Sequence, residues 1–551
     1  MRRQNIRQLC HACECSTIKS DHSKAKYKLR LPKKINQLVR NFQYKQLQAM
    51  SQNWLKNGLD GVRFGMHNKR GIFGASPGEI LHLIHLGEFK YIIESFFDQV
   101  GRDSIVCTQV NALTITIGNL LKRQSDRDVP RTNFPSGFVT GKGLMGHEVP
   151  GVLLVLLLTL HTTRYKDILR ESIFKKHTAE RGIGHHDFMQ DWITLLESVL
   201  CWEQWLKMDR MTKQEVDKSR KTHRHLMRLI KFVAPRKRGM KHCRIKFHLG
   251  LHIASDVLDF GVPANVDSTP LERSHKNNMK HTGANTQRRK LMLNKQTADR
   301  LVENIAIDRC WNEIKPPATH LLPPVPEPPP GTRTDSAVGG HFYVSLNARG
   351  NPHYTWKGSK KSKSVKVNGK LLKFLADSCL PNVNGTTLHC FTEHRRDGEI
   401  FRAHPLYMDL PWNDCVMINM VDGSEDIPAR ILCFVDLRDI SQGFDINGYH
   451  CHDNGLYAVV EMFELDDDDF VSDLVGHFTK EVDAEGKPLL YLMDVETFVA
   501  PAIGIPDVGS AVAGDYLFLK ERSAWSGLWS NLIQEYHKVK TPESDESGDE
   551  K

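Results

Sequence analysis

Four residues whose side chains bind metal ions stand close together near the start of the sequence. Cys10 and Cys13 are separated by two residues, a spacing at which two thiolates can bind one tetrahedral zinc ion. Cys15 and His22 would complete a C-x2-C-x-C-x6-H ligand set, although this is not the spacing of a standard zinc finger. The alternative is a set of reduced thiols without a ligand role, because the twelve cysteines are mostly scattered singly, as in a reducing compartment.

A second set of metal-ligand types occurs in KFHLGLHIASDVLDFG. His248, His252 and Asp256 follow one another at intervals of four residues, which places them on one face of a helix. The stretch lacks the glutamate of a zinc-protease helix, so a peptidase is not indicated. The alternative is an interior polar stripe that packs and forms hydrogen bonds.

The stretch SPGEILHLIHLGEFK predicts the start of a helix. Ser76, Pro77 and Glu79 form the pattern of a capping box with proline at the first helical position, and Ser76 is the expected N-cap. His82 lies one turn inside this helix. Capping explains Glu79 on structural grounds alone, whereas His82 is the better candidate for a functional role.

The same pattern recurs in STPLERSHK. Thr269, Pro270 and Glu272 again predict the start of a helix, but this helix is polar on nearly all sides. A glutamate among cations, beside a DNA strand, could hold a divalent metal ion while its neighbours bind phosphates. The alternative is a surface helix with a capping box.

The charges of the chain are divided unevenly. Residues 1–330 hold 54 Lys+Arg and 30 Asp+Glu, whereas residues 331–551 hold 21 and 35. The excess of basic residues in 1–330 indicates a polyanionic partner, most simply nucleic acid. The alternative is that these charges serve solubility alone. The nucleic-acid-binding residues are predicted in two basic segments, 221–246 and 273–290: Arg236, Lys237, Arg238, Lys241, Arg273, Lys276, Lys280, Arg288, Arg289 and Lys290.

The sequence pattern along the chain predicts that these residues are distributed over several domains. The helical pattern is broken by eight prolines within 315–331, which favour extended polyproline II structure. Beyond them HFYVSLN, DCVMINMV, RILCFVDLR, LYAVVEMFEL and DYLFLKE read as strands. The predicted parts are a cysteine-bearing basic segment (1–45), a helical region (46–314), a Pro-rich linker (315–340), a β-rich acidic domain (341–525) and a C-terminal segment with a disordered acidic tail (526–551).

These stretches, taken in order, resemble the C-terminal portion of cut-and-paste DDE transposases of the CACTA, Plavaka and KDZ type, including elements common in diatoms and similar algae. In that family a Cys-x-x-Cys follows the second of two catalytic aspartates, and Cys10 and Cys13 match it. A Cys/Asp-x-x-His signature opens a helix of the inserted region, where Glu79 and His82 match in position, with Glu79 replacing the usual Cys or Asp. The segment KFHLGLHIASDVLDFGVPANVDSTPLERSHK is similar to the end of the catalytic core, which implies that Glu272 is the last catalytic glutamate.

The resemblance covers about residues 5–305. It implies an α+β multidomain protein with a partial RNase H-like core, a large all-helical insertion and a mostly-β C-terminal domain. Intact relatives would perform magnesium-dependent DNA strand cleavage and transfer. Because the two catalytic aspartates would lie before Met1, and Glu272 alone cannot hold two magnesium ions, we expect this chain to bind DNA without cutting it.

Two other hypotheses remain open. One is a non-enzymatic nuclear DNA-binding protein whose acidic β-domain recruits protein partners, and the other is a zinc-dependent hydrolase that uses His248, His252 and Asp256. No apolar segment follows the first arginines, and the apolar run at 151–160 is too short to cross a bilayer and predicts a buried helix. We therefore expect an intracellular, nuclear protein without a membrane partner.

Overall fold

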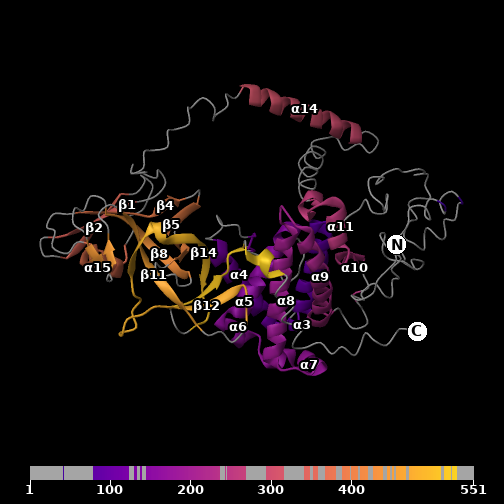
Figure 1. Ribbon diagram of the computed structural model, residues 1–551, viewed down its shortest axis with the longest axis horizontal. Helices are drawn as coiled ribbons and strands as arrows, with labels where there is room; N and C mark the ends of the chain where they lie inside the picture. Colours follow the sequence, from indigo (N-terminus) through magenta and orange to yellow (C-terminus); the bar gives the residue numbers. More distant parts are fainter. Residues whose placement is uncertain are drawn as a thin grey trace.

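The computed structural model contains a helical half followed by a half made mainly of strands (Figure 1). The α+β class predicted from the sequence is therefore confirmed. The Pro-rich linker and the acidic tail lie outside the described residues. The structure describes residues 37, 41, 78–102, 104–122, 130–132, 134, 137–138, 144–235, 242, 245–268, 293–314, 341–347, 351–357, 367–379, 387–396, 399–407, 410–419, 426–437, 444–446, 449–451, 455–466, 471–510, 514–522 and 524–529.

The helical half is built around α5 (Val149–His161), which is buried at every position. This confirms the buried helix predicted for 151–160, since a helix that is apolar on all faces must be surrounded by other elements. Among the described helices, none has both the length and the apolar character that a membrane crossing requires. The other elements of this half are η3 (Ile80–Phe89), α3 (Lys90–Val100), α4 (Ile105–Leu121), η5 (Gly146–Glu148), α6 (Thr163–Ile168), α7 (Glu171–Arg181), α8 (His185–Leu206), α9 (Lys213–Val233), α10 (Ile245–Gly250), α11 (Ile253–Phe260), η6 (Pro263–Val266) and α14 (Leu293–Ile314).

The five strands predicted from the sequence are confirmed as β1, β7, β8, β11 and β15. Every pairing among the described strands is antiparallel. The elements are β1 (His341–Leu346), β2 (Pro352–Lys357), α15 (Gly369–Cys379), β3 (Leu388–Phe391), β4 (Glu393–Arg396), β5 (Glu399–Tyr407), β6 (Leu410–Asn413), β7 (Cys415–Ile418), β8 (Ile427–Asp436), β9 (Phe444–Ile446), β10 (Tyr449–Cys451), β11 (Leu456–Leu465), β12 (Val475–Lys480), β13 (Tyr491–Asp494), η8 (Val495–Thr497), β14 (Phe498–Pro506) and β15 (Asp515–Leu519).

Six of these strands close into a barrel in the order β11–β12–β15–β14–β7–β8, because β8 pairs back with β11. Closure leaves none of the six with an open edge. Apolar side chains from β7, β11, β14 and β15 fill the interior, and a charged group lies among them. Glu461 Oε2 forms ion pairs with Arg430 Nη2 at 2.5 Å and with Lys480 Nζ at 2.9 Å. The carboxylate thus offsets part of the cost of burying two cations.

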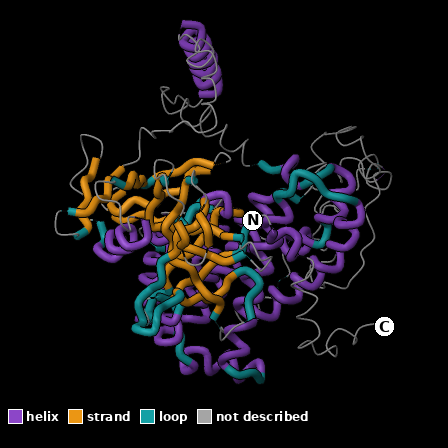
Figure 2. Tube along the Cα trace, turned by 60° about the vertical axis from the view of Figure 1, so that its left-hand side comes forward, coloured by secondary structure: helices purple, strands orange, loops and turns teal. Residues whose placement is uncertain are grey.

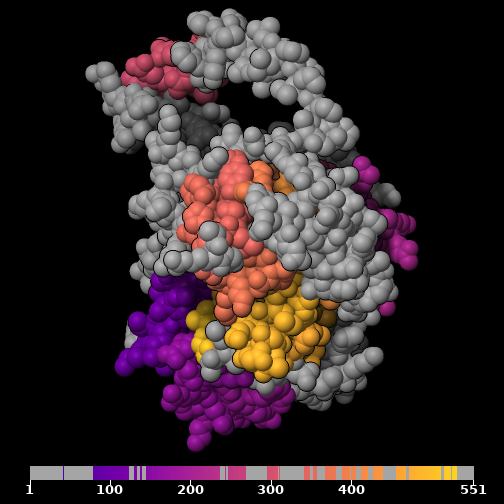
Figure 3. Space-filling view, turned by 90° about the vertical axis from the view of Figure 1, so that its left-hand side faces the viewer, coloured from indigo at the N-terminus to yellow at the C-terminus, as the bar shows by residue number. Residues whose placement is uncertain are grey.

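The barrel and the helices share one hydrophobic core. Leu474, Leu517 and Leu519 pack into the cluster that contains α5 and α8, as do Trp525 and Trp529. Strands lie directly against helices in Figure 2, and Figure 3 shows the C-terminal residues (yellow) against the early helices (indigo and purple). The boundary predicted at residue 525 therefore falls on the first of two neighbouring tryptophans that enter the same core.

Side chains of α8 form hydrogen bonds with the segment that precedes β12. Gln190 exchanges two hydrogen bonds with the backbone of Val471, at 2.8 and 3.0 Å. Two turns further along α8, the buried Glu197 accepts from the Ser472 hydroxyl and from the Leu474 N–H, the latter at 3.2 Å. The start of β12 is therefore held by both a half-buried and a buried side chain of the same helix.

The pKa of Glu197 makes this contact sensitive to pH. Burial raises the pKa of this carboxyl from 4.5 to about 7, against the opposing hydrogen bonds from Ser472 and Leu474. Between these two pH values the unfolded chain loses the proton while the folded chain keeps it. The free energy of unfolding therefore falls as pH rises from about 4.5 to about 7, by about 3 kcal/mol from this group.

Glu197→Gln is expected to remove this slope, because the amide does not titrate. Urea unfolding of the wild type and of the variant at several pH values measures the difference between their stabilities. Glu180→Gln, at an exposed position of α7, is the control and should leave the slope unchanged. Parallel stability curves for the wild type and Glu197→Gln would contradict the prediction.

Candidate functional site

A polar cluster lies at the start of η3. Glu79 has an extended backbone, with φ −112° and ψ 155°, and its carboxylate accepts from the N–H groups of Leu81 at 2.9 Å and His82 at 2.5 Å. Glu79 is therefore the N-cap itself, and the predicted N-cap Ser76 lies outside the described residues. The helix that follows is a π-helix of ten residues, a rare geometry that occurs frequently at functional sites.

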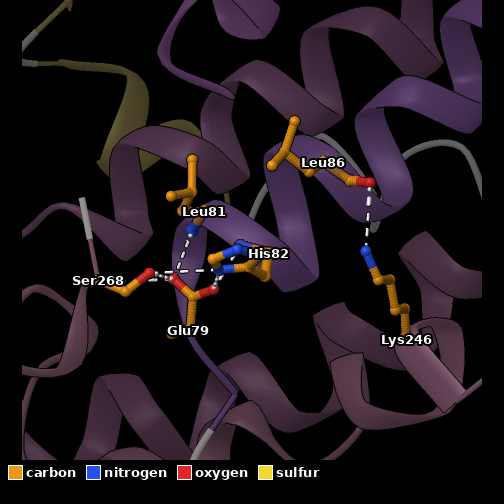
Figure 4. Close-up of polar contacts among 6 residues, drawn as sticks. All are labelled: Glu79, Leu81, His82, Leu86, Lys246 and Ser268. Atoms are coloured by element: carbon orange, nitrogen blue, oxygen red, sulfur yellow. Dashed lines mark hydrogen bonds and ion pairs between the residues drawn. The ribbon is translucent and has the colours of Figure 1, made fainter. Parts of the chain in front are cut away.

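Glu79 and His82 also contact Ser268, which is distant in the sequence (Figure 4). The Ser268 hydroxyl lies 3.0 Å from Glu79 Oε2 and 3.3 Å from His82 Nδ1, and His82 Nδ1 lies 2.5 Å from Glu79 Oε1. The Glu79 side chain is 18% exposed, and that of His82 is 51% exposed. Ser268 stands four residues before Glu272 in the sequence. The cluster therefore fixes the residue from which the chain continues toward that glutamate.

The three residues predicted as metal ligands on one helical face are divided by the structure. The helix breaks after Gly250, where a Cβ would lie 3.3 Å from Met227, so α10 and α11 are separate. His248 Nε2 and His252 Nε2 remain 3.1 Å apart, but Asp256 accepts from the Gly78 N–H at 3.0 Å. Within the part of the chain that is described, no three His, Cys, Asp or Glu side chains are arranged to hold a metal ion.

Helix α9 has one buried face and one basic face. Thr212 and Glu215 form a capping box that fixes its start, and the hydrogen bonds from Thr212 lower the pKa of Glu215. The inner face is apolar except for a few hydrogen-bonded groups. Lys218, Lys221 and Arg224 are exposed on the outer side, one after another at intervals of three residues. Such a row of cations is suited to successive phosphates of a nucleic-acid strand.

His223 fixes the inner face of α9 against α8. It accepts a hydrogen bond from Trp202 Nε1 at 2.8 Å, and its Nδ1 donates to the Ser219 carbonyl at 2.7 Å. Because an indole can only donate, the proton of the neutral imidazole must be on Nδ1. Burial lowers the pKa of His223 to about 4, so the ring is uncharged and adds nothing to the basic face.

The polar cluster and the basic face lie on adjacent elements. Arg220 of α9 donates to the Ser255 hydroxyl of α11 at 3.1 Å, and the next residue, Asp256, binds the Gly78 amide that precedes Glu79. Lys246 of α10 donates to the Leu86 carbonyl of η3 at 3.3 Å (Figure 4). These elements form one region of the helical half, at the end away from the barrel (Figure 1).

Several residues predicted from the sequence lie outside the described residues. They are the cysteine and histidine residues of the zinc prediction (Cys10, Cys13, Cys15 and His22), the glutamate Glu272 and the basic residues Arg236, Lys237, Arg238, Lys241, Arg273, Lys276, Lys280, Arg288, Arg289 and Lys290. Their roles stay predictions.

Two residues of this region were not predicted from the sequence, Lys218 and Ser268. Lys218 could have been found, because Lys218, Lys221 and Arg224 share the polar side of a helix whose apolar residues follow the helical period. Ser268 gave no such signal, since its importance comes only from contact with Glu79 and His82.

No protein-family model matches this chain, and neither a curated protein nor a solved structure matches it.

Proposed function

We propose that this chain is a transposase-derived protein that binds nucleic acid through the region formed by α9, α11 and the start of η3. The observation that carries the proposal is the contact of Glu79 and His82 with Ser268. The two stretches that resemble transposase motifs are 189 residues apart in sequence and are joined by hydrogen bonds. Such a contact would hold the signature of the inserted helical region against the segment that returns to the core.

The electrostatics of α9 support binding of a polyanion. Lys218, Lys221 and Arg224 are exposed, and the chain beyond the helix continues into the basic stretch PRKRGMK. The contact of Arg220 with Ser255 holds this row beside the segment that leads to Glu272. Nucleic acid bound along α9 would therefore approach the segment that ends at Ser268, four residues before Glu272 in the sequence. In an intact RNase H-like core this glutamate would bind magnesium.

Other parts of the proposal rest on the sequence alone. They are a zinc ion at the N-terminal cysteines, a nuclear location and recruitment of protein partners by the acidic strand-rich half. Binding is proposed for this chain because the exposed cations of α9 lie among the described residues, whereas strand cleavage would rest on the resemblance alone. A loss of magnesium-dependent nicking in Glu272→Ala would instead establish cleavage.

The proposal predicts that Lys221→Glu combined with Arg224→Glu weakens binding to a DNA duplex by at least about tenfold at ~0.1 M salt. The double substitution should also reduce the slope of log affinity against log salt by about two, since two phosphate contacts are lost. Fluorescence anisotropy of a labelled duplex across a salt series measures both quantities.

The matched control is Lys370→Glu combined with Lys373→Glu on α15. These lysines are also exposed and three residues apart, but they lie in the strand-rich half. The control should change affinity by less than about twofold, because charges beyond a Debye length are screened. Equal losses from the two double variants would show that binding depends on net charge and not on α9. Absence of binding by the wild type at low salt would overturn the proposal.

A further inference from the structure

The last described segment returns from the barrel to the helical half. Trp529 is fully buried, and its ring is stacked on Trp202 of α8, with centroids 6.2 Å apart and an interplanar angle of 18°. It also meets His223 of α9 edge to face at 5.4 Å. Trp525 is buried close by and donates to the Lys520 carbonyl at 2.9 Å. The chain is therefore anchored against the inner side of α9 at residue 529.

The sequence beyond this anchor becomes strongly acidic. Residues 541–551, TPESDESGDEK, contain five acidic residues and one lysine. The twelve residues from Trp529 to Thr541 could span at most about 40 Å when fully extended. His223 lies between Lys221 and Arg224 in the sequence of α9, and Lys218 to Arg224 covers only about 9 Å of the helix axis. The acidic segment is thus tethered within reach of the basic face.

We propose that residues 541–550 bind the exposed cations of α9, Lys218, Lys221 and Arg224, and compete there with nucleic acid. Two features carry this inference: the opposite charges of the two segments and the anchor at Trp529, which meets α9 itself. The competition with nucleic acid rests on the proposed function, whereas the docking of the acidic segment does not.

The tether gives weak charge pairs a measurable effect. Each pair on an exposed helix contributes little by itself, because water and salt screen it. A link of this length nevertheless gives an effective concentration in the millimolar range. A segment that binds with a dissociation constant near ~0.1 mM would therefore occupy the face most of the time, and would weaken nucleic-acid binding by about tenfold. Nucleic acid would displace the segment only when its concentration exceeds its own dissociation constant by more than about tenfold.

The first test compares the full chain with a variant of equal length whose tail is neutral: Glu543→Gln, Asp545→Asn, Glu546→Gln, Asp549→Asn and Glu550→Gln. The variant is expected to bind a labelled DNA duplex about tenfold more tightly at ~0.1 M salt. The difference should vanish near ~1 M salt, where the Debye length is about 3 Å. Equal affinities at low salt would overturn the competition.

The second test does not depend on nucleic acid. A labelled peptide of residues 541–551 is titrated with the neutral-tail chain, and saturable, salt-sensitive binding is expected. Adding Lys221→Glu and Arg224→Glu to that chain should abolish peptide binding, while adding Lys370→Glu and Lys373→Glu should preserve it. Equal peptide binding by both charge-reversed chains would overturn docking on α9.

The two tests together separate the two proposals. If the peptide binds α9 and neither chain binds DNA, the docking stands and the proposed function fails. If both chains bind DNA with the same affinity and the peptide does not bind, the proposed function stands and this inference fails.

Discussion

Trp529→Ala is expected to lower the free energy of unfolding by about 3–5 kcal/mol, the usual cost of truncating a buried tryptophan. The indole fills a space between Trp202 and His223, so its loss leaves a cavity where α8 and α9 meet. It also removes the anchor that returns the chain from the barrel to the helices. Urea unfolding followed by tryptophan fluorescence and by far-UV circular dichroism measures the loss.

The control for this prediction lies two residues earlier. Gly527 has open space around the position of a Cβ, so Gly527→Ala should leave stability unchanged or raise it slightly. Limited proteolysis adds a second readout, because loss of the anchor should expose the chain after residue 520 to cleavage. An unchanged midpoint of unfolding together with an unchanged cleavage pattern would show that Trp529 does not hold the two halves together.

Glu203→Gln is expected to cost about 3–5 kcal/mol, although it preserves the size of the side chain. The Glu203 carboxylate is buried on α8 and meets three cationic or ionisable groups: Lys207 at the end of the same helix, Arg522 at 3.2 Å and His85 at 3.4 Å. Removing its charge leaves Arg522 with 11% of its side chain exposed and without this counter-charge. Chemical denaturation at neutral pH measures the effect.

The pKa of Glu203 provides a second signature of the same contact. Burial opposes ionisation, but His85, Lys207 and Arg522 outweigh it and lower the pKa from 4.5 to about 2. The stabilisation is therefore complete above about pH 4.5 and is lost as pH falls toward 2. Glu203→Gln should remove this acid-side decline.

Lys207→Gln is the matched control for Glu203→Gln. The Lys207 side chain is 42% exposed, so loss of this partner should cost less than about 1 kcal/mol. If Glu203→Gln were no more costly than Lys207→Gln, the buried carboxylate would not be the link between η3, α8 and the C-terminal segment.

The sequence alone was sufficient for elements whose signal is local. The apolar run of α5 predicted a buried helix because all its faces need cover, and the β-branched runs of β8 and β11 predicted strands. The short β4, β6 and β13, with four residues each, gave no such signal. Closure of the barrel could not be predicted from the sequence either, because it depends on the pairing of β8 with β11. No local pattern specifies which strand pairs with which.

The same division applies to the candidate site. The charge asymmetry and the helical spacing of Lys221 and Arg224 can be read from the sequence, since both depend only on residue type and period. The sequence placed His248, His252 and Asp256 on one helix, but the helix breaks after Gly250 and Asp256 accepts from the Gly78 amide.

Only the tertiary structure brought Ser268 to Glu79 and His82, and Trp529 to α9. These contacts join segments 186 to about 300 residues apart, and their geometry follows from how the helices and the barrel share one core. Residue types and local periodicity thus determined which elements form and where charge accumulates. The burial of apolar surface between those elements decided which distant residues meet, because that free energy depends on the whole packed arrangement and not on any one segment.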